Sequence, residues 1–138
     1  MSKLLSRSSA RLSSAKSNWD KRNYDDAYVD LTCFDLQQSM EFALKYLIEM
    51  NGERYVTTHD LNAQLNKIDK MNIHDPVLEK VRLKSYVYNS WETESRYKDS
   101  FMPLAADVEE AISVCKELIL FVESNTNQKA ELNKLTAF

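Results

Sequence analysis

Residues 25–50 read DDAYVDLTCFDLQQSMEFALKYLIEM, and this stretch decides the fold. It holds no proline or glycine, and it is followed by Asn51-Gly52, a pair that favours a left-handed helix C-cap. We therefore predict one long helix, which at about 1.5 Å per residue spans roughly 40 Å. A rod of that length would run from one end of a small domain to the other.

Apolar side chains follow two opposite faces of this predicted helix. One stripe has Leu36, Met40, Ala43 and Leu47, and the other has Ala27, Leu31 and Phe34. A helix that is apolar on two sides is packed on two sides, so we predict a central position for it. The second stripe then becomes polar, because the same spacing leads to Gln38, Glu41 and Lys45.

The amino-acid composition limits the fold classes and the kinds of binding site that this chain can have. The 138 residues include one glycine and two prolines, which favours helices over sheets and excludes Walker and dinucleotide-binding glycine loops. A formal net charge of −3 gives no global basic footprint for nucleic acid. No zinc-type spacing of cysteines and histidines occurs, so we expect no metal and no cofactor. Cys33 and Cys115 lie in apolar stretches and are predicted to be buried, reduced thiols.

Four further helices are predicted around the long one. The first eighteen residues are serine-rich, basic and without acids, which is typical of a transit peptide. Leu5, Leu12, Ala15 and Trp19 nevertheless share one helical face, so we interpret the segment as a helix of the domain. Besides the helix at residues 25–50, we predict a first helix over residues 3–21 and a third from Thr57 or Thr58 to Met71. A fourth helix is predicted from Asp75-Pro76 to about Tyr97, and a fifth from near Pro103 to about Asn125.

Three motifs, in this order along the chain, resemble the HEPN superfamily. They are Phe34-Asp-Leu-Gln-Gln-Ser-Met-Glu-Phe-Ala-Leu-Lys45, Thr58-His59-Asp60-Leu61 and Arg96-Tyr97. The resemblance covers residues from about 5 to 123. It implies an all-α, up-and-down bundle of about five helices over residues 1–125, followed by a polar tail at 126–138. Short loops between long helices favour the same antiparallel arrangement.

The resemblance also implies partners and an activity. Such domains commonly form homodimers, and many are encoded beside a small nucleotidyltransferase as toxin and antitoxin. Many family toxins are metal-independent ribonucleases with an Arg-x(4–6)-His motif near the end of the fourth helix. This chain reads Arg96-Tyr-Lys-Asp-Ser-Phe-Met-Pro103 at that place, and none of Phe101, Met102 and Pro103 can transfer a proton. We therefore expect a cytoplasmic binding or partner module with no membrane segment.

Two other functions stay open at this stage. The chain could be a ribonuclease toxin that uses Arg96 with an unusual second residue, or one that uses Arg54 and His59, which formally fit Arg-x4-His in the connection after the long helix. It could also be a nucleotide-binding domain. In that case nucleotide or RNA would be the ligand, held by side chains and helix ends.

The candidate binding residues are polar or aromatic side chains in the resembling motifs. Arginine offers a planar donor fork for phosphate or carboxylate, and tyrosine offers a stacking face with a polar tip. Each also has a structural reading. Glu41 and Lys45 fit an i, i+4 ion pair, Arg96 can pair with Glu92 or Glu94, and Lys98 and Arg82 could join Arg96 in an anion site. The candidates are Arg96, Tyr97, Gln38, Glu41, Lys45, His59 and Asp60; Tyr86, Tyr88 and Trp91 are expected in the core.

Overall fold

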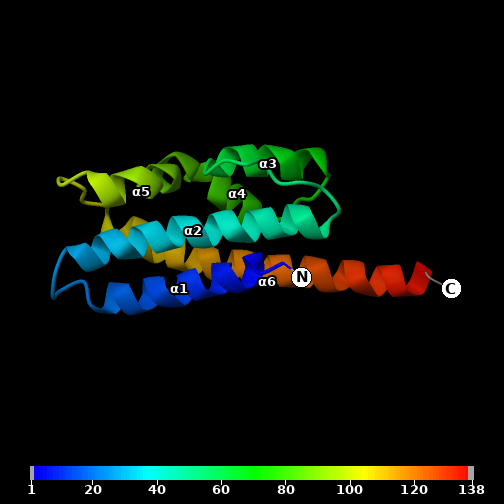
Figure 1. Ribbon diagram of the computed structural model, residues 1–138, viewed down its shortest axis with the longest axis horizontal. Coiled ribbons are helices and arrows are strands. Elements are labelled where there is room, and N and C mark those ends of the chain that lie inside the picture. The colour runs from blue at the N-terminus through cyan, green and yellow to red at the C-terminus, as the bar shows by residue number, and fades with distance from the viewer. Residues whose placement is uncertain (1, 137–138) are drawn as a thin grey trace.

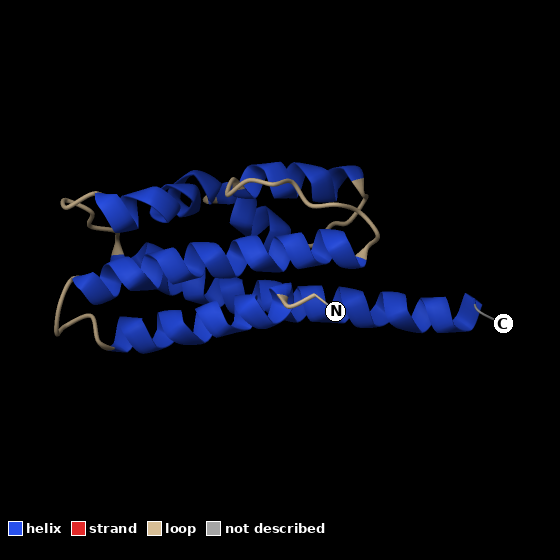
Figure 2. Ribbon diagram, viewed as in Figure 1, coloured by secondary structure: helices blue, strands red, loops and turns tan. Residues whose placement is uncertain are grey.

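The computed structural model describes residues 2–136, and every regular element within that range is an α-helix (Figures 1 and 2). The predicted all-α bundle is therefore confirmed. The described part of the chain has six helices where about five were predicted. They are α1 (Leu4–Asp20), α2 (Ala27–Met50), α3 (Leu61–Lys70), α4 (Pro76–Leu83), α5 (Ser85–Tyr97) and α6 (Ala105–Thr136).

Helix α2 lies at the centre, as its sequence predicts. It packs against α1, α3, α5 and α6, and Figure 1 shows it between α1 on one side and α3 and α5 on the other. Its main apolar stripe has no exposed surface at Leu36, Met40, Ala43 and Leu47. Full burial of one such large side chain stabilises a fold by roughly 1.5–3 kcal/mol. The central rod therefore contributes much of the core.

The second apolar stripe of α2 is not buried, and that prediction is wrong. Leu31 is 49% exposed and Ala27 is exposed, while Phe34 is half-buried. Helix α1 contacts α2 through Ser39 instead, where the Ser8 hydroxyl donates to the Ser39 carbonyl at 2.7 Å and the Ser39 hydroxyl to the Ser8 carbonyl at 2.9 Å. Because α1 and α5 pack to either side of the stripe, it remains open between them.

The N-terminal segment is a helix of the bundle, in agreement with its apolar spacing. Leu12 and Ala15 are buried in the core, and Leu5 and Trp19 pack against it half-buried. One of its serines, Ser8, is fully buried against α2, where the two helices pack closely. A larger side chain there would push α1 away from α2.

Helix α3 begins later than predicted. Its N-cap is Asp60, whose carboxylate accepts from the Asn62 N–H at 2.9 Å, so neither Thr57 nor Thr58 caps it. Thr58 instead accepts the Asp60 N–H in a local turn at 3.2 Å. The next start was predicted correctly, since Asp75 accepts from the Val77 N–H and Pro76 opens α4.

The predicted fourth helix is broken in two at Lys84. Its backbone there, with φ −115° and ψ 19°, leaves the helical region. The Lys84 ammonium bonds Asp107 at 2.8 Å and Glu110 at 2.6 Å, and these bonds raise the pKa of that lysine. The break lets α4 pack on α6 while α5 packs on α2. The apolar stripe Val77, Val81, Tyr88 and Trp91 is still buried throughout, whereas Tyr86 is 76% exposed and not in the core.

Helix α6 does not end near Asn125 but continues to Thr136. Figure 1 shows this end projecting beyond the other helices. Leu132 and Leu135, at 59% and 75% exposed, lie on the projecting part. Lys129 still contacts the body, because its ammonium donates to the Asn51 side chain at the end of α2, at 3.3 Å.

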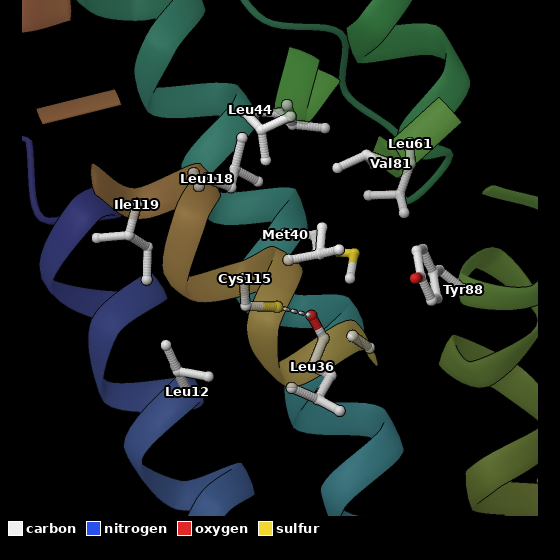
Figure 3. Close-up of a cluster of buried hydrophobic side chains, with 14 of the residues drawn as sticks. Leu12, Leu36, Met40, Leu44, Leu61, Val81, Tyr88, Cys115, Leu118 and Ile119 are labelled. Carbon is white, nitrogen blue, oxygen red and sulfur yellow. Dashed lines mark hydrogen bonds between the residues drawn. The ribbon is translucent and has the colours of Figure 1, made fainter. Parts of the chain in front are cut away.

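Figure 3 shows two polar groups in the hydrophobic core, the Cys115 thiol and the Tyr88 hydroxyl. The Cys115 thiol donates to the Leu36 carbonyl at 3.5 Å, and burial raises its pKa to about 12. Burial also raises the pKa of the Cys33 thiol. Both cysteines are buried, as predicted, and neither forms a disulfide. Tyr88 is fully buried, and its hydroxyl has no hydrogen-bond partner among residues 2–136.

Removing residues 126–138 tests whether the tail is separable from the domain. We expect the truncated chain to fold, with a free energy of unfolding lower by no more than about 1 kcal/mol, since the main loss is one lysine at the C-terminus of α2. Urea denaturation followed by circular dichroism measures this. Loss of cooperative unfolding would show that the projecting end belongs to the core.

Tyr88→Phe removes a buried hydroxyl that has no partner in the described chain. We expect unchanged or greater stability, by up to about 1 kcal/mol, because the desolvation cost of the hydroxyl disappears while the ring stays. The same denaturation measurement checks it, with Tyr86→Phe as the exposed control. A clear loss of stability would mean that the hydroxyl is bonded after all.

Candidate functional site

A buried carboxylate organises the middle of α2. The Glu41 side chain is 2% exposed and bonds the Lys45 ammonium at 3.1 Å through Oε2. Its Oε1 lies 2.9 Å from Nδ1 of His59 and 3.3 Å from Nε2 of Gln37. One carboxylate therefore joins two positions on α2 to the connection between α2 and α3.

Helical spacing and the connection together build this network. Gln37, Glu41 and Lys45 follow one another at i, i+4, so their side chains meet on one face. The Gln37 amide also donates to the His59 carbonyl at 3.1 Å, and Gln38 donates to Gln37 at 2.7 Å. Buried polar groups need such partners, and here they come from α2 itself and from His59 of the connection.

The network presents one exposed, titratable group to solvent. The His59 side chain is 64% exposed although its Nδ1 is held by the buried Glu41. When Nδ1 carries the proton it donates to Glu41 and leaves Nε2 free as an acceptor facing outward. The arrangement can hold an imidazole in one orientation, as an acid–base group requires.

Asp60 directly follows His59 in the sequence but makes different contacts. Its carboxylate caps α3 and also accepts from the Asn89 amide of α5 at 2.9 Å. The same Asn89 accepts the Leu61 N–H at 2.9 Å. Asp60 is thus engaged in joining α3 to α5, and no described contact links it to Glu41.

Arg96 and Tyr97 lie at the end of α5, beside a different part of α2. The Arg96 guanidinium is 4.8 Å from the Phe34 ring centroid and 5.0 Å from that of Tyr97. It also bonds the Glu92 carboxylate and carbonyl, which confirms the predicted pairing with Glu92. Tyr97 is 72% exposed.

The predicted gathering of Arg82 and Lys98 around Arg96 does not occur. Arg82 bonds Asp69 on α3 at 2.8 Å, and Lys98 lies 3.6 Å from Glu94. Both are ion pairs between partly exposed groups, each of small energetic value. The three cations therefore serve separate local contacts.

A second set of cations was missed by the sequence analysis. Arg11 of α1 lies 5.5 Å from the same Phe34 ring and bonds the buried Asp35 at 2.9 Å. Arg7 lies one turn earlier on α1, and both line a depression of about 450 Å³ floored by Phe42. Phe34 and Arg96 do not line this depression but adjoin it, because Arg11 and Arg96 both lie over the Phe34 ring. The arginine groove is defined here as Arg7, Arg11 and Phe42 of the depression together with the adjoining Phe34 and Arg96.

The i, i+4 spacing of Arg7 and Arg11 was a usable signal, because it places both on one face of a helix. It could not be converted into a site without the register of α1 against α2. That register is set by the contact between Ser8 and Ser39, which the composition of the segment does not reveal.

Arg54 and His59 are not brought together. Arg54 is exposed and lines a shallow depression with Glu49, Glu53, Tyr55 and Thr57. Among residues 2–136 no hydrogen bond or ion pair joins it to His59, whose ring contacts Glu41. The Arg-x4-His spacing in this connection therefore has no contact to support it.

The described part of the chain holds neither a metal-type cluster nor a membrane-spanning helix. Within residues 2–136, histidine, cysteine and acidic side chains form no group of three or more suited to a metal ion. No helix of that range combines the length and the apolar character that crossing a bilayer requires.

The three motifs lie on one bundle, the first on α2, the second at the start of α3 and the third at the end of α5. The family model of the HEPN domain matches residues 1–125. The chain belongs to the HEPN family. Comparisons with curated proteins and with solved structures gave no match.

Glu41→Gln tests the network of this HEPN chain. The substitution keeps the volume but removes the charge that Lys45 and His59 contact, so we expect a loss of roughly 1–3 kcal/mol in the free energy of unfolding. Glu49→Gln, an exposed position on the same helix, is the control and should change little. Equal effects at the two positions would show that burial of Glu41 has no energetic weight.

Proposed function

We propose that this HEPN chain is a homodimeric binding and partner module, and that its partner is a small nucleotidyltransferase of the toxin–antitoxin type. The observation that supports this most is the state of Arg96. Its guanidinium is bonded to Glu92 and packed on Phe34, and the residues that follow it are apolar where the ribonuclease motif would have histidine.

The surroundings of Arg96 favour a structural role for it. General acid–base cleavage of RNA needs a group that gives or takes a proton beside the arginine. Met102 and Pro103 lie at the turn into α6 and offer none, and Phe101 packs against the core. A protein with this scaffold can still present surfaces to a partner, which requires shape and charge rather than proton transfer.

Co-expression with any small nucleotidyltransferase that a neighbouring gene encodes tests the proposal. We expect a complex that survives size-exclusion chromatography at micromolar concentration, while the isolated HEPN chain elutes as a dimer. Labelled RNA incubated with the isolated chain should stay intact. Failure of the two proteins to associate would contradict the proposed partnership, and a monomeric isolated chain would contradict the homodimer.

One observation favours a second candidate, a ribonuclease that uses His59. A buried carboxylate orients this exposed imidazole, which is an arrangement that positions a general base. Under this alternative, expression arrests growth, and His59→Ala relieves the arrest. If RNA survives and the substitution does not change growth, the alternative is ruled out.

A further inference from the structure

The arginine groove presents positive charge on a chain whose net charge is negative. The side chains of Arg11 and Arg96 are 40% and 38% exposed, whereas their partners Asp35 and Glu92 are 6% and 15% exposed. The carboxylates therefore lie beneath the guanidiniums, and solvent meets the cations first. The groove is a local exception to the formal charge of −3.

Arg7 is the cation of this groove that has no ion pair. It is exposed, and its side chain makes no ion pair or hydrogen bond with any other residue of the range 2–136. Arg11, by comparison, uses only Nη1 on Asp35. Free N–H donors at two successive turns of α1 suit carboxylate or phosphate groups, which accept from the arginine fork in pairs.

The surface between these cations is partly apolar, and the Asp35 carboxylate and Ser14 also line it. Phe34 and Phe42 are half-buried on α2, two turns apart, and Leu31 is 49% exposed. Leu31 and Phe34 belong to the second stripe of α2, which the bundle leaves partly uncovered. An occupant of the groove must therefore supply both negative charge and apolar side chains.

We propose that the arginine groove binds an acidic, partly apolar segment of a partner protein. Its carboxylates pair with Arg7, Arg11 and Arg96, and its apolar side chains pack on Phe42 and Leu31, which no guanidinium covers. The inference rests on the proposed role of this chain as a partner module and names the surface and the chemistry of the partner.

Nucleic acid fits the groove less well. A base that stacked on Phe34 would have to displace a guanidinium, because Arg11 and Arg96 already lie over that ring at 5.5 Å and 4.8 Å. A second copy also fits less well. A two-fold contact through this groove pairs the patch with itself, which would bring the arginines of both copies together.

A synthetic acidic peptide tests the inference directly. The probe is a fluorescein-labelled peptide of repeated units of two glutamates and one leucine, followed by fluorescence anisotropy with the full chain. We expect binding that weakens about five-fold in Arg7→Ala and more in Arg7→Glu, as is typical for a charged contact at the edge of an interface. Added salt should weaken it too.

Three controls accompany this measurement. Lys70→Ala removes an exposed cation at the end of α3 and should leave peptide binding unchanged. A peptide with glutamine in place of glutamate should not bind. Thermal unfolding of each variant confirms that Arg7, which lies on the surface, can be changed without loss of the fold.

Several results would overturn the inference. They are no peptide binding at millimolar concentration, peptide binding that Arg7→Glu leaves unchanged, or tighter Arg7-dependent binding of a labelled oligouridylate of equal charge. The proposed function is tested separately. If Arg7→Glu leaves the nucleotidyltransferase complex intact, the proposed partnership stands but the groove is not its interface. If no complex forms at all, the result contradicts the partnership alone.

Discussion

The structure depends on how α2 places polar side chains in a position surrounded by other helices. Gln37 and Glu41 are buried there, and an unpaired buried carboxylate would cost several kcal/mol. Lys45 of the same helix bonds one oxygen, and the other accepts from Gln37 of that helix and lies 2.9 Å from His59 of the α2–α3 connection. The connection is therefore tied to the central helix at His59, directly before the residue that caps α3.

The same helix divides the surface into two kinds of region. On the side that faces α3, the polar side chains of α2 are hydrogen-bonded within the network of Glu41. Toward the groove, Phe34 and Phe42 remain partly uncovered, and arginines from α1 and α5 surround them. One helix thus accounts for both the internal polar network and the external patch, since adjacent residues point about 100° apart around its axis.

The sequence predicted correctly those features that depend on residues of one helix. It did not predict features that depend on a contact with a residue of another helix. The centrality of α2, the Asp75-Pro76 start and the Arg96–Glu92 pair follow from spacing within one helix. The break falls at Lys84, whose ion-pair partners Asp107 and Glu110 lie more than twenty residues away and were not visible from local spacing. Arg7 and Arg11 were missed for the same reason, because Phe34 belongs to another helix. The roles of the candidate site residues stay predictions.

The paired hydroxyls of Ser8 and Ser39 act as a spacer between α1 and α2. Since these two side chains are among the smallest that can hydrogen-bond, they fix both how closely the helices approach and how far one slides along the other. The width of the arginine groove is therefore determined from inside the bundle. Sequences that keep every arginine but enlarge either serine would carry the same charges at a different separation.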